Sequence, residues 1–382
     1  MEREPARRQP KRLTAALYRY RTEGGTPLRQ ALAVGLGLYI GASPFYGFHL
    51  LLAIALGGLF GLNRLKVYIA ANISIPIIAP FLCALEIQVG SWLRRGAFYS
   101  TASLGDIQLR GLAADILIGS VVVGLVLAIA GSIGTYIVVS GRELPPRVAA
   151  LLTAAAARYL PGGLWAWELS HGKLRMDPVY LQVLRDGVLP DGGTIVDVGC
   201  GRGLMLTLLA VAREQYRKGE WPESWPAPPL SSSLMGLERR ATAAAKAREA
   251  LGDDAVIQEL DVTSAAIPPA KAILLFDVLQ MMPREAQDRL LEHAVVALEP
   301  GGVLVIREAD AAEGWRFSRV RLGNRIVAIV QGQPGRAFYF RTAEQWKARL
   351  GELGLAPTIA RSPGVPRANF LLHAVKGSVT RA

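Results

Sequence analysis

Three long apolar runs occupy the first third of the chain, at residues 31–62, 67–93 and 112–139. A membrane-spanning helix needs about 20 consecutive apolar residues, so each run is long enough to cross a bilayer. Proline and glycine interrupt the first two runs, which predicts a kinked helix or re-entrant half-spans there. The third run holds Asp115 near its start and predicts an ordinary spanning helix. Glu86 lies near the end of the second run, where it can reach the membrane interface.

From about residue 178 the pattern changes to short apolar strands separated by amphipathic helices. The strands are expected at residues 194–198, 234–238, 255–260, 272–276, 303–307 and 369–376. Such alternation is typical of a parallel α/β sheet. We therefore predict an α-helical transmembrane N-terminal domain followed by an α/β C-terminal domain. The expected segments are a basic segment at 1–29, a helical transmembrane domain at 30–140, a helical linker at 141–177 and the α/β domain at 178–376.

The net charge of +12 is unevenly distributed along the chain. Residues 1–150 contain 15 basic and 7 acidic residues, whereas residues 151–382 contain 28 and 24. Positive charge that borders uncharged apolar runs is typical of membrane proteins, and we favour this explanation over nucleic-acid binding. Residues 1–29 are expected to be either an interfacial helix on an anionic leaflet or a solvated tail, and to lie in the cytoplasm.

Composition excludes several classes of protein. Hydrophobic residues make up 51% of the chain and charged residues 19%, against about 25% charged residues in an average soluble protein. These values exclude an intrinsically disordered chain. The two cysteines, Cys83 and Cys200, exclude a disulfide scaffold and a multi-cysteine zinc site. No two of the four histidines have the spacing of helical metal ligands, so no metal site is expected.

A glycine-rich turn follows the first predicted strand, with the sequence Asp197-Val-Gly199-Cys200-Gly201-Arg-Gly203. Glycines let the backbone turn tightly and let a ligand approach closely. The turn follows the carboxyl end of a strand, where open α/β sheets bind ligands. By itself, this motif also suits a dinucleotide site or a plain turn.

Three acidic residues follow the next three predicted strands. Glu238 ends the second strand, Asp261 follows the third and Asp277 follows the fourth. A carboxylate in the position of Glu238 can accept hydrogen bonds from both hydroxyls of a ribose. This acid comes later in the chain than the usual spacing of about 20 residues predicts, and the Pro/Ser-rich insertion at 221–233 accounts for the delay.

The order of glycine turn, acids and Pro300-Gly301-Gly302 resembles the class I S-adenosylmethionine-dependent methyltransferases over residues 178–376. The resemblance implies a Rossmann-like fold and S-adenosyl-L-methionine as the cofactor. It also implies a role for each matching residue. Asp197, Gly199, Cys200, Gly201 and Gly203 would form the loop around the methionine part, Glu238 would hold the ribose, Asp261 and Val262 would face the adenine, and Asp277 would line the cleft near the methyl group.

The catalytic candidates are Asp277 and Gln280. Many similar enzymes have a His-rich stretch after the fourth strand, but this chain has Asp277-Val-Leu-Gln280-Met-Met. An amide can orient an acceptor but cannot take its proton, so no general base is evident. The chain also lacks the Asn/Asp-Pro-Pro-aromatic motif of amino-methylating DNA enzymes, which disfavours a nucleic acid substrate. The aromatics and arginines of residues 311–341 suit either an amphiphilic or anionic acceptor or an exposed flap with solvated charges.

The first part of the chain, from residue 27 to 139, resembles a bacterial membrane domain of unknown function, number two-thousand-and-sixty-two in the usual family naming. The matching pieces are Gly41-Ala-Ser-Pro-Phe-Tyr-Gly-Phe-His49, Leu62-Asn63 and Gly90-Ser-Trp-Leu93. The family usually has Asn-Pro in the second run, whereas Ile75-Pro76 stands here. The family implies no chemistry.

We therefore predict a membrane-anchored methyltransferase whose acceptor is a small lipophilic molecule, such as a lipid, quinone or polyene-type intermediate. It is expected in the bacterial inner membrane as a multi-pass protein, with the catalytic domain in the cytoplasm, where the cofactor is made. If the N-terminus and the catalytic domain both lie in the cytoplasm, the chain crosses the membrane an even number of times. Two alternatives stay open. The membrane part could be a transport or assembly module with a methyltransferase-like sensor or scaffold, or the substrate could be RNA.

Overall fold

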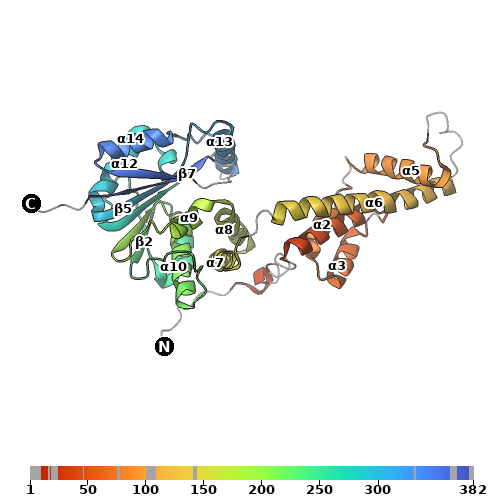
Figure 1. Cartoon of the computed structure of the whole chain (residues 1–382), viewed down its shortest axis with the longest axis horizontal. Helices are drawn as coiled ribbons and strands as arrows, with labels where there is room; N and C mark the ends of the chain where they lie inside the picture. Colours follow the sequence, from red (N-terminus) through yellow and green to blue (C-terminus); the bar gives the residue numbers. More distant parts are fainter. Residues whose placement is uncertain are drawn as a thin grey trace, which may run out of the picture. The chain divides into compact units, whose positions relative to one another are not determined.

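The computed structural model describes residues 10–15, 18, 25–45, 47–74, 78–99, 109–140, 144–330, 333–361 and 368–377. These residues form two compact units, one within residues 12–144 and the other made of residues 10–11 together with those from 145 onward (Figure 1). The described part of the first unit is helical, and the second unit contains a seven-stranded sheet. The segment predicted at residues 1–29 falls largely outside the described residues.

The apolar runs of the first unit are divided into shorter helices. These are α2 (Pro27–Gly41), α3 (His49–Leu59), α4 (Arg64–Ala71), α5 (Ala79–Arg95) and α6 (Leu109–Ser140). The breaks predicted in the first two runs therefore occur, because α2 and α3 share the first run and α4 and α5 share the second. Thr26 caps α2 by accepting a hydrogen bond from the backbone N–H of Arg29, and Asn63 caps α4 in the same way. Helices α2 and α5 both pack along α6.

Small residues bring α5 and α6 into backbone contact. A Cβ atom at Gly90 would lie 1.8 Å from the carbonyl oxygen of Asp115, and one at Gly119 would lie 1.8 Å from that of Glu86. Only glycine fits such an approach, which is a common way for apolar helices to pack in membranes. The buried Asp115 carboxylate accepts hydrogen bonds from Arg94 and from the hydroxyl of Tyr99, at 2.7 and 2.8 Å.

One helix of the described residues is long and apolar enough to cross a membrane. It is the 31-residue segment Arg110–Ser140 of α6, and only 22% of its most apolar window is covered by other parts of the protein. The other helices of this unit are shorter than a span needs. The structure thus supports one candidate membrane helix, and a multi-pass arrangement stays a prediction.

The second unit begins with helices that precede the sheet. These are α7 (Pro146–Ala157), the 3₁₀ turn η2 (Leu160–Gly162), α8 (Leu164–Met176) and α9 (Pro178–Arg185). Helix α7 packs against α8 and against α10 (Leu204–Arg217), and α9 packs against the last strand. The segment that we expected to be a helical linker therefore contributes helices to the second unit.

The sheet consists of β1 (Thr194–Val198), β2 (Ser233–Glu238), β3 (Val256–Glu259), β4 (Ala270–Phe276), β5 (Leu298–Ala309), β6 (Ala356–Ala360) and β7 (Asn369–Val375). Its order is β3-β2-β1-β4-β5-β7-β6. The first five strands are parallel, but β7 pairs antiparallel with both β5 and β6. The prediction of a parallel sheet is therefore corrected to a mixed one. Strand β6 was not predicted, because its sequence Ala-Pro-Thr-Ile-Ala is short and contains proline.

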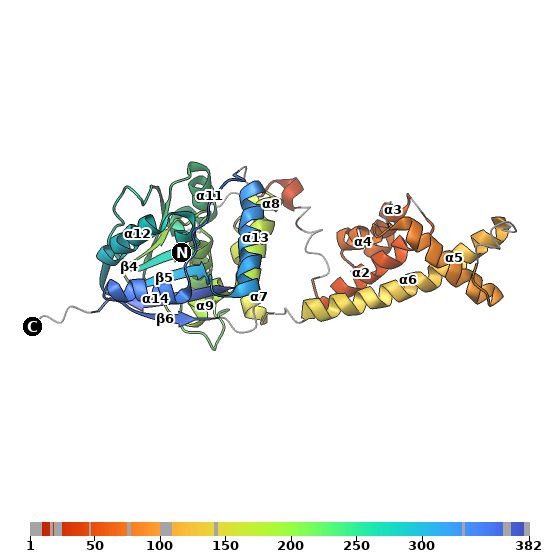
Figure 2. The same cartoon turned by 90° about the horizontal axis from the view of Figure 1, so that it is seen from above.

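Helices cover both faces of this sheet (Figures 1 and 2). The remaining ones are α11 (Ala241–Leu251), η3 (Gly252–Asp254), η4 (Leu279–Met281), α12 (Arg284–Ala297), α13 (Gly314–Val330) and α14 (Ala343–Glu352). Central strands are buried on both sides, as in the fully buried run Ala272–Leu275 of β4. Trp346 of α14 and Leu291 of α12 pack against this strand and β5 on one face. This layering holds the carboxyl ends of β1 to β5 at one edge.

Candidate functional site

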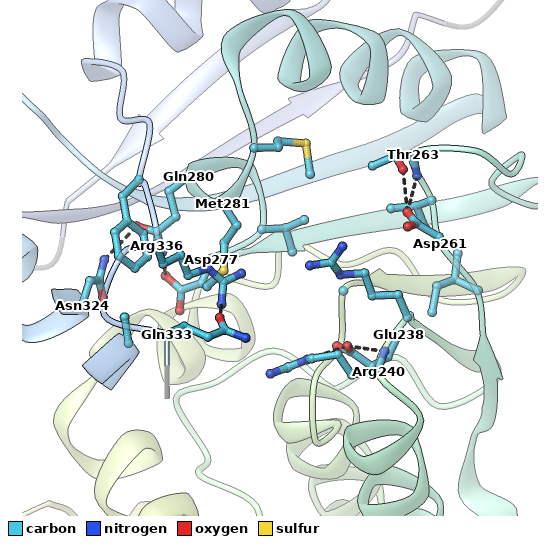
Figure 3. A pocket seen from close by; sticks show the side chains of 18 of the residues that line it. Glu238, Arg240, Asp261, Thr263, Asp277, Gln280, Met281, Asn324, Gln333 and Arg336 are labelled. Atoms are coloured by element: carbon cyan, nitrogen blue, oxygen red, sulfur yellow. Dashed lines mark hydrogen bonds and ion pairs between the residues drawn. The ribbon is translucent and has the colours of Figure 1, made fainter. Parts of the chain in front are cut away.

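A cavity of about 450 Å³ lies at the carboxyl ends of β1 to β4 (Figure 3). Its volume falls within the range of small-molecule sites, about 300–1,000 Å³. Six of the predicted site residues line it: Gly199, Glu238, Asp261, Val262, Asp277 and Gln280. The others, Asp197, Cys200, Gly201 and Gly203, belong to the strand end and turn beside it.

The turn after β1 needs glycine for steric reasons. Gly199, Gly201 and Gly203 all have positive φ angles, of 67°, 59° and 76°. A Cβ atom at Gly199 would lie 2.5 Å from the Val278 side chain, and one at Gly203 would lie 2.8 Å from Leu251. The backbone therefore lies close to the turn after β4 and to helix α11, where a side chain would not fit. Cys200 is buried beneath this turn, and burial raises the pKa of its thiol, which suits a packing role.

Glu238 is held in place by the glycine turn itself. Its carboxylate is 4% exposed. One oxygen accepts a hydrogen bond from the backbone N–H of Gly201 at 2.9 Å. The other accepts from the backbone N–H and the Nε–H of Arg240, each at 2.9 Å. The end of β2 thus presents a fixed, buried carboxylate to the cavity, and the half-exposed Arg240 side chain shields it.

Asp261 and Val262 form another wall of the cavity. Asp261 accepts hydrogen bonds from the backbone N–H and the hydroxyl of Thr263, at 3.0 and 2.7 Å. These bonds hold the pKa of its carboxyl below the usual range. Leu260 and Val262 supply apolar surface beside it. A flat, partly polar ring fits such a wall.

Asp277 occupies a strained position at the end of β4. Its φ of 60° is the only positive value among the described residues other than glycine. Its carboxylate pairs with Lys173 at 2.6 Å and accepts a hydrogen bond from the amide of Gln280 at 3.1 Å. It also contacts Arg307, whose guanidinium reaches the buried Asp177 on its other side. Two cations thus fix the carboxylate at the cavity.

Sequence reasoning did not find Lys173, Arg307 and Asp177. Lys173 and Asp177 lie in the segment expected to be a linker, and Arg307 was considered only as the last residue of a strand. One signal was present. An arginine in an otherwise apolar buried strand requires an acidic partner.

Gln280 connects the cavity to the segment that covers it. Its side-chain oxygen accepts a hydrogen bond from Asn324 of α13 at 3.1 Å, and its carbonyl accepts from the backbone N–H of Tyr339 at 2.8 Å. Its own backbone N–H donates to Glu308, whose burial raises that carboxyl's pKa to about 7. Residues of 311–341 therefore line the cavity instead of forming a detached flap.

Arginines from two elements face each other across this cavity. Arg239 and Arg240 follow β2, and Arg336 comes from the covering segment (Figure 3). Burial lowers the pKa of Arg336, and repulsion from Arg239 and Arg240 lowers it further. The site therefore has a local excess of positive charge that an anionic group would neutralise.

Asp197 lies at the end of β1 and is 3% exposed. Burial raises the pKa of its carboxyl to about 8, and the nearby Glu238 charge adds to this rise. In an unfolded chain the same group has a pKa of about 3.9. Since the unfolded chain loses the proton first, stability from this residue is fully present below about pH 4 and is lost as the pH rises through about 8.

We expect Asp197→Asn to stabilise the protein increasingly as the pH rises. An amide has no proton to lose, so its advantage over the native protein should grow by about 1.4 kcal/mol per pH unit up to the folded-state pKa and then level off. The free energies of unfolding of both proteins in detergent, measured in urea between about pH 5 and pH 9, check this. A gap that does not change with pH would contradict it.

Two family models match parts of this chain. Residues 170–358 match a family model described as a methyltransferase domain, and residues 11–144 match one described as an uncharacterized protein conserved in bacteria (DUF2062). A carboxy-S-adenosyl-L-methionine synthase from Chromohalobacter salexigens is 33% identical over 122 residues. That match covers 31% of this chain and 40% of the relative, so the chain spans about two fifths of the relative's length.

Solved structures are similar at lower identity. Magnesium protoporphyrin IX methyltransferase (ChlM) from Synechocystis PCC 6803, with bound SAH, is 17% identical with a TM-score of 0.38. The match covers 56% of this chain and 88% of that one. The YcgJ protein from Bacillus subtilis is 10% identical with a TM-score of 0.39, over 52% of this chain and 99% of that one.

Proposed function

Since the chain joins a DUF2062 domain to a class I S-adenosylmethionine-dependent methyltransferase domain, we propose that it is a membrane-anchored enzyme that methylates a lipophilic acceptor. One observation carries this proposal above the others. A glycine turn, a buried carboxylate at the end of β2 and a covered apolar cavity meet at one edge of the sheet. That combination suits a nucleoside cofactor beside an apolar substrate.

The residues at this edge fit S-adenosylmethionine. The positive φ angles of the turn let a ligand approach the backbone at Gly199. Glu238 offers carboxylate oxygens for ribose hydroxyls once Arg240 turns away, and Asp261 and Val262 offer a wall for the adenine. When bound, the cofactor would supply a methyl group on a sulfonium. In-line displacement at that methyl group breaks the C–S bond and releases a neutral thioether, which is a good leaving group.

The protein's own contribution is to position the acceptor beside the cofactor and to exclude water from the cavity. Lys173 and Arg307 hold Asp277 at the cavity, and Asp277 in turn holds the amide of Gln280. The ion pair with Asp277 fixes the Lys173 side chain, so we assign Lys173 a positioning role. Catalysis would then rest on orientation of the acceptor, which can supply much of the rate enhancement of a displacement reaction.

The cavity also indicates the class of acceptor. Met281, Met282 and Phe338 supply apolar surface, and Arg336 faces Arg239 and Arg240 nearby. An apolar body with an anionic group satisfies both features, because the anion relieves the repulsion between the guanidinium groups. A lipid or lipid-like intermediate that carries a carboxylate or phosphate has this chemistry.

The membrane anchor belongs to the same proposal. Helix α6 is the candidate span, and the shorter apolar helices would enter the bacterial inner membrane as half-spans of a multi-pass domain, with the catalytic domain in the cytoplasm. Tethering an enzyme to the membrane raises its effective concentration toward a membrane-dissolved acceptor.

The test uses the full chain in vesicles of bacterial lipid extract, with S-adenosylmethionine labelled in its methyl group. We expect label to enter the organic phase, and we expect added S-adenosylhomocysteine to suppress the transfer. Vesicles of synthetic phosphatidylcholine alone serve as the control without extracted acceptor. Label that enters only water-soluble products would contradict a lipophilic acceptor, and an inability to bind the cofactor would contradict the enzyme itself.

A further inference from the structure

Helix α13 has two faces of different character. Its inner face carries Asn324 and Ala328, which line the cavity, and the partly buried Phe317. Phe317 packs edge to face against Phe340 with ring centroids 4.9 Å apart. This face is therefore attached to the methyltransferase domain, and Figure 2 shows the helix on the outside of that unit.

The outer face exposes an apolar stripe. Trp315, Leu322, Ile326 and Ile329 are 61%, 60%, 52% and 54% exposed. Their spacing of seven, four and three residues places them on one side of the helix. Large apolar side chains that cluster in this way, instead of occurring singly, mark an interaction surface.

Arginines flank this stripe on the same helix. Arg316, Arg319, Arg321 and Arg325 are all exposed, the helix contains no acidic residue, and Arg316 pairs with Glu313 directly before the helix. The guanidinium groups of Arg316 and Arg319 lie 5.9 and 5.6 Å from the centre of the Trp315 ring. An exposed apolar stripe bordered by arginines, with a tryptophan at one end, has the composition of a helix that lies in the interface of an anionic membrane.

We propose that the outer face of α13 binds the surface of an anionic lipid bilayer. Charge complementarity selects this occupant, because phospholipid phosphates match the four arginines and acyl chains match the stripe. A second copy of the same face would place eight arginines in contact, which like-charge repulsion disfavours. Since the inner face of the same helix lines the cavity, the contact would place the site beside its acceptor, and that consequence rests on the proposed function.

The experiment follows a fluorescent label on the outer face. Leu322→Cys in a Cys83→Ala background is labelled with bimane, in the full chain reconstituted into vesicles with brominated acyl chains. In vesicles of mixed phosphatidylcholine and phosphatidylglycerol, the label should lose roughly half its fluorescence, because an interfacial helix buries its apolar face about 5–10 Å into the boundary of headgroups and acyl chains. The Cys83→Ala protein serves as the labelling blank, because its remaining cysteine, Cys200, is buried in the turn.

The matched control is Val296→Cys on α12 of the same unit, where the native side chain is 80% exposed. Its label should stay unquenched. Arg319→Gln with Arg325→Gln should remove most of the quenching at position 322. The proposal is overturned if the two labels are quenched equally in anionic vesicles, or if phosphatidylcholine alone quenches position 322 as strongly. The readout needs neither cofactor nor acceptor, so failure of methyl transfer would leave it unchanged.

Discussion

Glu238→Gln should weaken binding of S-adenosylmethionine to the full chain by about 100-fold or more. The native carboxylate is buried and fixed by Gly201, so only the Arg240 side chain has to move before the carboxylate accepts bonds from the ribose. Hydrogen bonds to a charged group contribute about 1.5–3 kcal/mol each, and the amide replaces an acceptor by a donor at the same place. Two such bonds account for about 3 kcal/mol, or roughly two orders of magnitude in affinity.

Calorimetric titration in detergent measures this effect. Arg240→Gln is the matched control, because Arg240 bonds the same carboxylate from its half-exposed position. Since its removal leaves only the backbone N–H of residue 240 on that oxygen of Glu238, we expect the affinity to stay within about threefold or to increase. Equal losses in the two variants would show that the turn, and not the carboxylate, is the determinant. An unchanged affinity in Glu238→Gln would remove this residue from the cofactor site.

Arg307→Met should cost about 3–5 kcal/mol of folding free energy, because it leaves the buried Asp177 carboxylate without its cation. The Arg307 side chain is 7% exposed and contacts both Asp177, which is 1% exposed, and Asp277. Lys173 still neutralises Asp277 in the variant, so most of the cost arises at Asp177. Urea unfolding of the full chain in detergent, followed by tryptophan fluorescence, measures the loss.

Two further variants make this prediction specific. Asp177→Asn combined with Arg307→Met should recover more than half of the loss, since asparagine removes the charge and can still cap α9 through Val179. Arg147→Met is the matched control, because Arg147 also pairs with an acid, Glu223, but both side chains are exposed, at 45% and 86%. It should cost at most about 1 kcal/mol. Equal losses for the buried and exposed arginines would contradict the argument.

The network around Arg307 also explains why part of the site was not predicted. Asp277 was found because it follows a strand in a recognisable order. Its partners come from α8 and β5, which are 104 and 30 residues away in the chain. Spacing along a sequence carries no information about such pairs, because they exist only when separate elements pack together.

The membrane part shows the same limit in another form. Apolar runs and their interruptions predicted where helices break, and the breaks between α2 and α3 and between α4 and α5 occur as expected. The runs did not indicate that Arg94 lies against Asp115, where the two charges neutralise each other. Arg94, at the end of one apolar run, is thus the ion-pair partner of an acid in the next.

Local chemistry in the sequence was sufficient to locate the two domains, the glycine turn and the acids at the strand ends, because glycine, proline and apolar periodicity act within a few residues. Only the tertiary structure revealed that β7 is antiparallel, that Lys173 and Gln280 both contact Asp277, and that α13 has two different faces. Those features depend on contacts between distant segments. Which side of a helix is covered, and which acid meets which base, follows only from how the elements pack.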